Sequence, residues 1–396
     1  MLKRKIQSNF LNKCLSGLVL CSLLVFFRIP DHAGPIQANP NCLHVSGDKI
    51  LNGSNKAVGL SGLNWFGFET STNAPHGLSV RNWKDMLDQI KSQGYNVIRL
   101  PFSNAMLKDG VMPSGIDYRI NPDLKNLTSL QVMDRIIGGA AARGIKIILD
   151  NHRSTPGNGP ESNGLWYTTG YPENRWIADW KMLVTRYKSK DAVIGVDLRN
   201  EPHGACWGCG DPSKDWRLAA EKAGNAILSV NPNILIIVEG VSEYDGQYTW
   251  WGGNLMGAKK YPVWLDVPDR LVYSVHEYPQ TIYPQPWFND PNYPKNLPAV
   301  WDKYWGYIIT ENIAPVLIGE FGTRYETEKD RQWLQTFQDY IQQNDVSWTF
   351  WSLNPNSRDT GGLLLDDWIS VNQPKQAILR EIQYPLIKSI CVKKEK

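Results

Sequence analysis

Residues 193–202 read VIGVDLRNEP, an apolar run that ends in an asparagine, a glutamate and a proline. Pro202 lacks the N–H group that a sheet ladder needs, so we expect the strand to stop there. This places the carboxylate of Glu201 at the carboxyl end of a buried strand. A charge in that position is costly unless it is solvated, paired or used. Glu201 therefore needs a partner elsewhere in the chain.

Eight short apolar runs, including this one, alternate along the chain with stretches of helical periodicity. They are rich in Val, Ile, Leu and aromatic residues and show little polar alternation, which is typical of parallel strands buried on both faces. The predicted strands are Val58–Trp65, Val97–Ser103, Lys146–His152, Val193–Pro202, Ile234–Val241, Leu271–Tyr278, Pro315–Gly322 and Ser347–Asn354.

Apolar residues at helical spacing fill most of the gaps between these strands, and Gly94 and Gly144 are stop signals. The predicted helical stretches are Asn82–Ile90, Ser129–Ile137, Trp176–Tyr187, Trp216–Leu228 and Asp330–Ile341. Strands that alternate with helices in this way predict an α/β fold, a (β/α)8 or TIM barrel. No linker rich in Pro, Gly or Ser interrupts the alternation, so we expect one domain over residues 39–396.

Composition narrows the classes of partner. The chain has 42 basic and 39 acidic residues, a formal net charge of +3, which argues against nucleic acid because no cationic excess is present to neutralise phosphates. It also has 17 Trp and 17 Tyr, more aromatic side chains than a core needs. Such a surplus favours stacking platforms, and the apolar faces of sugar rings are one ligand that stacks on them.

The N-terminus has the pattern of a secretory signal peptide. Basic residues 3–5 precede the 13-residue apolar run Leu15–Phe27, and small residues follow between Ala33 and Ala38. We expect residues 1–38 to be removed, which makes the protein secreted, extracellular and free of stable membrane association. The alternatives are a membrane anchor, for which the run is short, and a lipoprotein at Cys21, which lacks a small residue before it.

Four cysteines follow the signal segment, an even number for an oxidising compartment. We expect a local disulfide between Cys206 and Cys209, and a second between Cys42 and Cys391 that ties the two ends of the barrel together. A zinc site that includes His203 is the alternative for the first pair. Only one Cys-x-x-Cys occurs and secretion favours oxidation, so we predict the disulfide and no metal.

Polar residues lie at the carboxyl ends of nearly all predicted strands, which is the face where barrels carry their active sites. The predicted strand ends carry Asn64, Arg99, Asp150, His152, Asn200, Glu201, Glu239, His276, Glu277, Tyr278, Glu320 and, on the last strand, Trp351. One such residue means little, but eight strands that follow the same rule are a strong joint signal.

Glu201 and Glu320 are the candidate catalytic pair. Strands four and seven face each other across an eight-stranded barrel, so the two carboxylates can lie on either side of a sugar. Glycoside cleavage needs an acid for the leaving oxygen and a second carboxylate about 5 to 5.5 Å away in a retaining enzyme. The two groups need different pKa values. We expect Arg99 to keep Glu320 ionised and a drier setting to keep Glu201 protonated.

The other candidates are substrate-binding residues. Asn200 is placed to bond the sugar 2-hydroxyl and Trp351 to form a stacking floor, while the long connection over residues 247–269 is expected to form a substrate wall. The predicted substrate-binding set is Asn64, Arg99, His152, Asn200, His276, Tyr278, Trp351, Trp250 and Trp251, with Trp264 and His76 as further candidates.

Two glutamates at equivalent strand ends are rivals for the catalytic roles. Glu277 alternates out of phase with His276 and Tyr278, so we expect it to point away from the barrel axis. Glu239 is harder to dismiss, and we interpret it as one half of a structural ion pair.

These motifs resemble glycoside hydrolase family 5 (cellulase family A). The similarity is carried by NEP at 200–202 and GEFG at 319–322, together with the polar rim above. It extends to GLNWFGFE at 62–69 and CWGCGDP at 206–212, which resemble secreted bacterial endo-β-1,4-glucanases. The resemblance covers nearly all of the chain from Leu43 to the last strand.

The resemblance implies a single catalytic domain that hydrolyses β-1,4-glucosidic bonds of cellulose and related β-glucans with retention of configuration. Glu201 would be the acid/base and Glu320 the nucleophile. It implies no cofactor and no metal, with the polysaccharide as the partner of a monomer. Cellulases of the family often carry a further disulfide between the loops after strands one and three. Here those loops read TST at 70–72 and RST at 153–155, without cysteine.

Three alternatives remain open at this point. A β-mannanase or xyloglucanase is compatible with the same scaffold, because sugar preference depends on loop contacts that a sequence does not specify. A non-catalytic carbohydrate-binding barrel is disfavoured by the presence of both glutamates. A cell-surface structural protein would require that the N-terminal segment is not cleaved.

Overall fold

The computed structural model describes residues 37–39, 42–387 and 390–391. Nearly all of the predicted signal segment, and the charged C-terminal tail, lie outside the described residues, so the signal peptide stays a prediction. Within the described ranges, the helices are too short or too polar to cross a membrane.

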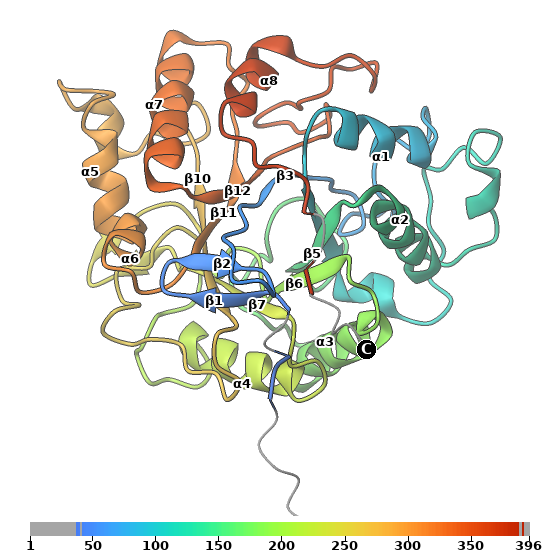
Figure 1. The fold of residues 1–396 in the computed structure, drawn as a ribbon, viewed down its shortest axis with the longest axis horizontal. Coiled ribbons are helices and arrows are strands. Elements are labelled where there is room, and N and C mark those ends of the chain that lie inside the picture. Colours follow the sequence, from blue (N-terminus) through green and yellow to red (C-terminus); the bar gives the residue numbers. More distant parts are fainter. Residues whose placement is uncertain (1–36, 40–41, 388–389, 392–396) are drawn as a thin grey trace, which may run out of the picture. The chain divides into compact units, whose positions relative to one another are not determined.

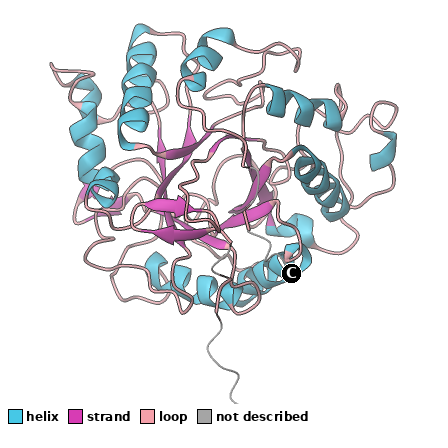
Figure 2. Ribbon diagram, in the orientation of Figure 1, coloured by secondary structure: helices cyan, strands magenta, loops and turns pink. Residues whose placement is uncertain are grey.

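Eight parallel strands form a closed barrel, and helices surround it (Figures 1 and 2). Each strand pairs in parallel with two neighbours, and the β12–β3 pair joins the last strand to the first. The strands, in ring order, are β3 (Ser61–Asn64), β4 (Val97–Ser103), β5 (Lys146–Arg153), β6 (Val193–Asp197), β7 (Leu235–Glu239), β10 (Leu271–Glu277), β11 (Val316–Phe321) and β12 (Ser347–Phe350). The predicted (β/α)8 barrel is confirmed.

The fourth strand of the barrel ends earlier than expected. The prediction that it reaches Pro202 was wrong, because β6 stops at Asp197. The backbone N–H of Asn200 still donates to the carbonyl of Asn151 on the neighbouring strand, at 3.1 Å. Glu201 then takes a left-handed conformation with φ 46°. The chain therefore turns away at Glu201 itself, before the proline.

The five predicted helical stretches are confirmed, and side chains cap several of them. Asn82 caps α1 by accepting from the N–H of Lys84, and Thr128 opens α2 in a capping box with Gln131. The helices are α1 (Trp83–Ser92), α2 (Ser129–Arg143), α3 (Glu173–Tyr187), α4 (Trp216–Leu228), α5 (Leu297–Trp301), α6 (Tyr307–Thr310), α7 (Glu328–Asn344) and α8 (Gln373–Arg380). Short 3-10 or π turns cover Asn104–Leu107, Pro122–Leu124, Pro286–Asn289 and Asp302–Gly306.

Two hairpins were not predicted, because their strands are too short to show periodicity. The pair β1 (His44–Ser46) and β2 (Lys49–Leu51) lies at the amino end of the barrel. There Leu43 and Ile50 pack in one cluster with strand residues such as Val97 and Ile148. The pair β8 (Glu243–Tyr244) and β9 (Gln247–Tyr248) follows the carboxyl end of β7 in the chain. The first hairpin therefore closes the bottom of the barrel with apolar side chains.

Two disulfides join the four cysteines that follow the signal segment. One links Cys42 to Cys391 and the other links Cys206 to Cys209. In the second, the sulfur atoms that a zinc ion would need are bonded to each other.

The loops after β3 and β5, which contain no cysteine at residues 70–72 and 153–155, are linked by their backbones. The N–H of Gly157 donates to the carbonyl of Glu69 at 3.0 Å. A single backbone hydrogen bond is a weaker link than a covalent one, so the contact between these loops depends on their packing.

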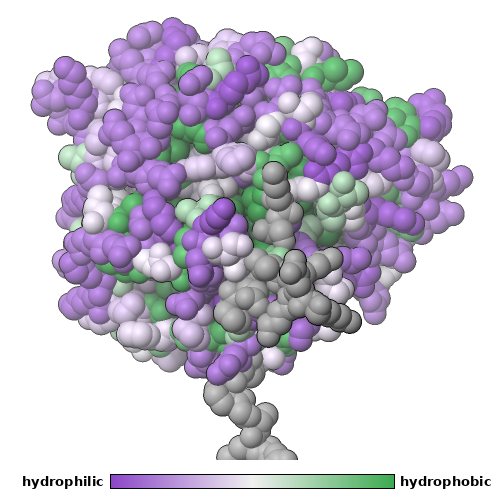
Figure 3. Space-filling model, in the orientation of Figure 1, coloured by the Kyte–Doolittle hydropathy of each residue, from purple (hydrophilic) through white to green (hydrophobic). Residues whose placement is uncertain are grey.

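One face of the molecule is shown in Figure 3. It is mostly hydrophilic, and its apolar residues lie in small separate areas. The large apolar side chains are instead concentrated in the core around the barrel, where Trp176, Trp216 and Trp348 are among those fully buried.

The contact between α1 and α2 gives a stability prediction from two adjacent glycines. Both lie inside α2, so alanine gains about 1 kcal/mol of helix propensity at either position. A Cβ on Gly138 meets no described atom within 4 Å, whereas one on Gly139 lies 2.3 Å from Cζ3 of Trp83. We expect Gly138→Ala to raise the free energy of unfolding by about 0.5 to 1 kcal/mol.

Gly139→Ala is the matched variant and should lower the free energy of unfolding by about 1 to 3 kcal/mol, because the methyl group overpacks the helix contact. Urea denaturation of both variants checks this. Equal effects at the two positions would contradict the proposed close approach of α1 and α2.

Candidate active site

A cavity of about 1250 Å³ opens at the carboxyl ends of the barrel strands. Eight of the predicted site residues line it: His152, Asn200, Glu201, Trp250, Trp251, Tyr278, Glu320 and Trp351. Further aromatic side chains extend the cavity wall, namely Tyr248, Tyr283, Trp287 and Tyr304. The rim predicted from the strand ends therefore converges on one cavity.

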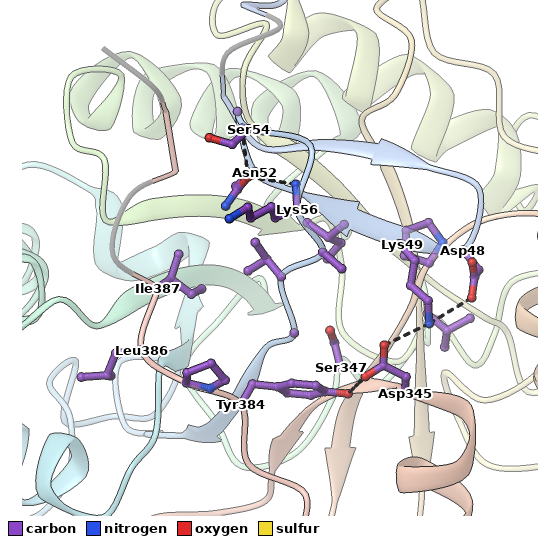
Figure 4. Close-up of a pocket in the computed structure, with 18 residues that line it drawn as sticks. Asp48, Lys49, Asn52, Ser54, Lys56, Asp345, Ser347, Tyr384, Leu386 and Ile387 are labelled. Carbon is purple, nitrogen blue, oxygen red and sulfur yellow. Dashed lines mark hydrogen bonds and ion pairs between the residues drawn. The ribbon is translucent and has the colours of Figure 1, made fainter.

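A second cavity lies at the other end of the barrel and has a different character (Figure 4). It measures about 600 Å³ and is bounded by the β1–β2 hairpin and by the chain around Tyr384. Lys49 lies 3.2 Å from both Asp48 and Asp345, and Tyr384 donates to Asp345 at 2.8 Å. The residues that line this cavity include none of the predicted site residues, so we assign the chemistry to the first cavity.

Glu320, on β11, has both carboxylate oxygens held by donors. Arg99 Nη1 donates to Oε1 and the Tyr278 hydroxyl donates to Oε2, each at 2.7 Å. Burial alone would raise the pKa of Glu320, but the charges of His276, Arg99 and His152 lower it to about 2. Its side chain is only 5% exposed. Glu320 is therefore a buried carboxylate that stays ionised.

Glu201 differs from Glu320 in its surroundings. Its Oε1 lies 2.9 Å from His276 Nδ1, and its side chain is 12% exposed. Burial raises the pKa of Glu201, which the hydrogen bond and charge of His276 oppose and the charges of Glu320 and Glu239 reinforce. The two glutamates therefore have pKa values shifted in opposite directions, as a proton donor and an ionised partner require.

The spacing of the two carboxylates is short. One oxygen of Glu201, one of Glu320 and a ring nitrogen of His276 all lie within 4.8 Å of one another. This agrees with the separation of about 5 to 5.5 Å found in retaining pairs, and not with the 6.5 to 9.5 Å or so of inverting pairs.

Arg99 is the hub beneath the cavity. Its fully buried guanidinium contacts Asp150 at 3.2 Å, Asp197 at 2.9 Å, Glu239 at 3.0 Å and Glu320 at 2.7 Å. Sequence reasoning anticipated the contact with Glu320, and the contact with Glu239 confirms the interpretation of that residue as one half of an ion pair. The contacts with the two aspartates were missed, because Asp197 lies inside a strand and its direction depends on the closed barrel.

Asn64 and Asn200 both serve Arg99. Oδ1 of each accepts from the guanidinium at 3.0 Å. Asn64, which was expected to bind substrate, is fully buried and its Nδ2 donates to the carbonyl of Gly319, so it supports Arg99 from below the cavity. Nδ2 of Asn200 is buried and makes no hydrogen bond within the described residues, although Asn200 lines the cavity. That N–H group is therefore available to a ligand.

The two histidines of the rim are both held by acidic side chains. His152 Nδ1 lies 2.7 Å from Asp150, and its ring stacks on Trp351 with 5.5 Å between centroids. Burial alone would lower the pKa of His152, but the charge and hydrogen bond of Asp150 raise it. The pKa of His276 is raised well above its ordinary value, because the carboxylates of Glu239, Glu320 and Glu201 outweigh burial.

The aromatic candidates divide into those inside the cavity and one outside. Trp250 is 7% exposed and meets the ring of Tyr278 edge-on, while Trp251 is 48% exposed and stacks on His203 with 3.9 Å between centroids. Trp264 is 71% exposed and is not among the residues that line the cavity.

The remaining candidates lie away from the reacting groups. His76 is bonded to Thr70 at 3.1 Å and to Asn356 at 3.0 Å, at the edge of the Phe66 ring. Glu277 accepts from Trp305 Nε1 at 3.0 Å, and burial raises its pKa to about 8. It points away from the carboxylate pair, as its alternation predicted.

Fold and site together define a class: a (β/α)8 barrel with two neighbouring glutamates, one with a lowered pKa and one with a raised pKa, in an aromatic cavity suited to sugars. The cellulase family (glycosyl hydrolase family 5) matches residues 51–357, and the chain belongs to this family.

Relatives with curated names extend over most of the chain. An endoglucanase from Paenibacillus polymyxa is 53% identical over 380 residues, which cover 93% of this chain and 94% of that protein. The major extracellular endoglucanase of Xanthomonas campestris pv. campestris is 43% identical over 84% of this chain and 69% of its own length.

Solved structures agree with the fold. The catalytic domain of the major endoglucanase from Xanthomonas campestris superposes with a TM-score of 0.81 at 41% identity, covering 86% of this chain and 99% of that one. A variant endocellulase from Pyrococcus horikoshii, in complex with cellotetraose, gives the same score at 41% identity, over 87% of this chain and all of that one.

The contacts of Glu320 predict a change in pH dependence. The role of nucleophile that we expect for Glu320 requires its ionised form, so we expect activity to fall as the pH drops through its lowered pKa. Tyr278→Phe removes a hydrogen bond that favours the charged form. We expect the acid limb of kcat/KM to move to higher pH, and kcat/KM to fall by about tenfold or more, as for a lost hydrogen bond to a charged group.

Tyr304→Phe is the matched control, because Tyr304 lines the same cavity but donates to the carbonyl of Tyr248. It should leave the position of the acid limb unchanged. An equal shift of the limb in both variants would show that Tyr278 does not set the pKa of Glu320.

Proposed function

We propose that this protein is a secreted, retaining endo-β-1,4-glucanase that hydrolyses internal bonds of cellulose and related β-glucans by double displacement. One observation carries the proposal: Glu201 and Glu320 approach within 4.8 Å with pKa values shifted in opposite directions. Neither step needs a metal or an organic cofactor.

In the first step, the ionised Glu320 attacks the anomeric carbon of the bound sugar. The bond from that carbon to the glycosidic oxygen breaks, and Glu201 gives its proton to the departing oxygen. A covalent glycosyl ester on Glu320 and a shortened glucan chain result. Arg99 and Tyr278 donate hydrogen bonds that hold the carboxylate of Glu320 in place until it forms the ester bond.

In the second step, Glu201 acts as a base. It takes a proton from a water molecule, whose oxygen bonds to the anomeric carbon while the ester bond to Glu320 breaks. Glu201 is protonated again and Glu320 leaves as a carboxylate. Two inversions at one carbon retain its configuration.

Binding of the sugar chain is assigned to the residues that line the cavity. The N–H of Asn200 suits the 2-hydroxyl of the sugar that reacts, and the ring of Trp351, which also lines the cavity, offers a stacking surface. Trp250 and Trp251 extend the platform beyond the acid/base. The names of the relatives support β-glucan as the substrate, and the cellotetraose complex is of an endocellulase.

Secretion rests on the N-terminal segment and on a relative named as extracellular. We propose that the mature enzyme is a monomer with a polysaccharide substrate, without a nucleic acid partner and without stable membrane association. A β-mannanase or xyloglucanase has no specific contact in its favour. A purely carbohydrate-binding barrel does not account for the split pKa values of the pair.

Hydrolysis of carboxymethylcellulose, barley β-glucan and mannan tests the substrate and the site together. We expect wild-type activity on the two β-glucans, and a loss of about 10²- to 10⁴-fold in Glu201→Ala, the range of general acid–base catalysis. Glu320→Ala should lose at least as much. Near-wild-type activity in either variant would refute the site, and activity on mannan alone would refute the substrate.

Azide distinguishes the roles of the two glutamates. With an activated aryl β-glycoside, azide should restore turnover of Glu320→Ala and give a glycosyl azide of inverted configuration, because azide replaces the missing nucleophile. Glu201→Ala should instead give a glycosyl azide of retained configuration, because azide attacks the ester intermediate. Nuclear magnetic resonance of the products reads the configuration, and the reverse pattern would exchange the two roles.

A further inference from the structure

Glu239 is a buried carboxylate at the rim that the reaction above leaves without a role. It is the last residue of β7, next to the strand that leads to Glu201, and it is fully buried. A buried carboxylate is costly unless its oxygens are satisfied, so its contacts indicate what it holds.

Three groups of the site contact the two oxygens of Glu239. Oε2 accepts the backbone N–H of Glu201 at 2.7 Å, and Oε1 accepts from Arg99 Nη2 at 3.0 Å. Oε1 also lies 3.3 Å from His276 Nε2, an ion-pair contact without the alignment of a hydrogen bond. One side chain thus joins the backbone of the acid/base, the histidine beside it and the arginine below it.

The backbone contact matters because Glu201 is strained. A non-glycine residue at φ 46° lies in a sparsely populated region of backbone conformation and persists only where its surroundings hold it. Glu239 holds the N–H of Glu201. On the other side, the backbone N–H of His203 donates to the carbonyl of Glu201 at 2.7 Å. The main chain of the acid/base is therefore clamped on both sides.

The histidine contact orients the carboxyl group of Glu201. His276 faces Glu239 with Nε2 and Glu201 Oε1 with Nδ1. A negative charge on the Nε2 side favours a ring that carries protons on both nitrogens, and such a ring donates from Nδ1 to Oε1 of Glu201. With Oε1 engaged, the proton that Glu201 transfers is carried on its other oxygen.

The chain that carries the aromatic wall packs directly on Glu239. A Cβ on Gly252, which has φ 76°, would lie 2.6 Å from Oε2 of Glu239. The backbone N–H of Gly240 bonds to the carbonyl of Gly252 at 2.9 Å, which closes the segment over the carboxylate. Glu239 is thereby kept dry and in one position.

From these contacts we propose that Glu239 is a positioning residue for proton donation, which acts on the substrate only through Glu201. It holds the left-handed backbone of Glu201 and the His276 ring that aims the carboxyl group at the leaving oxygen. The proposal rests on the proposed function, in which Glu201 is the proton donor. It replaces our interpretation of Glu239 as a structural ion pair alone.

The test uses two substrates that differ in their need for an acid. Cellotetraose loses a poor leaving group that must be protonated, whereas 2,4-dinitrophenyl β-cellobioside loses a phenolate that leaves without a proton. For the aryl glycoside, kcat/KM reports the steps up to formation of the ester intermediate. Glu239→Gln keeps the size of the side chain. Its amide N–H₂ group replaces one carboxylate oxygen, so it cannot accept a hydrogen bond from the donor at that position, either the N–H of Glu201 or Arg99.

We expect Glu239→Gln to lower kcat/KM for cellotetraose by about 10²-fold, the lower end of general acid catalysis, and for the aryl glycoside by less than about threefold. Glu277→Gln is the control. It is a buried carboxyl group on the next strand whose pKa of about 8 keeps it neutral at pH 7, so the amide mimics its native form. It should leave both values unchanged.

Two further variants complete the design. In a Glu201→Gln background, Glu239→Gln should cause no additional loss with cellotetraose, because a positioning residue has nothing left to act on. Glu239→Asp keeps the charge near Arg99 but withdraws the carboxylate from the N–H of Glu201. Glu239→Asp should likewise lose more kcat/KM with cellotetraose than with the aryl glycoside. It replaces Glu239→Gln in the test if that variant does not fold.

Equal losses of kcat/KM with both substrates would overturn the inference. They would show that Glu239 acts through Arg99 on the nucleophile Glu320, which both substrates need. An additional loss in the Glu201→Gln background, or wild-type values in Glu239→Gln, would also overturn it. The proposed function has its own outcome: full activity of Glu201→Gln on cellotetraose would refute the proton donor, whatever Glu239 does.

Discussion

The buried guanidinium of Arg99 is the interaction on which the site depends. It contacts four carboxylates that are 0 to 5% exposed, and one positive charge cannot balance four negative ones there. Neighbouring side chains reduce this excess of negative charge. The acids around them raise the pKa of His152 and of His276, so both rings favour the charged form. Burial and the charge of Glu239 raise the pKa of Asp197 well above its ordinary value, which favours a neutral acid. The cluster therefore approaches electrical balance only as a whole, and removal of one member affects the others.

The same cluster explains how two identical side chains a few ångströms apart acquire different chemistry. Both glutamates are buried, and burial raises the pKa of each. Glu320 sits on a strand, directly above Arg99, and receives two strong donors. Glu201 has left its strand through a left-handed turn. Its carboxyl group contacts His276, whose ring also lies near Glu320. Backbone path, and not residue type, thus separates the ionised carboxylate from the proton donor.

Much of this arrangement could be predicted from the sequence. Apolar runs that alternate with helical periodicity are sufficient for a barrel, and the barrel alone places Arg99, Glu201, His276 and Glu320 on one rim. The prediction was wrong where local pattern and tertiary contact compete. Strand β6 ends at Asp197 although both neighbouring strands continue past it, and the chain turns at Glu201, before the proline that seemed to terminate the strand. Asn64 resembled a ligand contact, but the closed sheet directs it under Arg99.

The sequence by itself therefore determined which residues reach the rim, because strand periodicity and the direction of parallel strands follow from local chemistry. Only the tertiary structure decided what each of them does there. The pKa of a buried carboxyl group depends on neighbours from other strands. Alternation along the strand predicted the direction of Glu277, which contacts a tryptophan outside the barrel. It did not predict that Glu239 contacts the backbone of Glu201. That contact arises from barrel closure and from the chain packed over Glu239, which no single strand encodes.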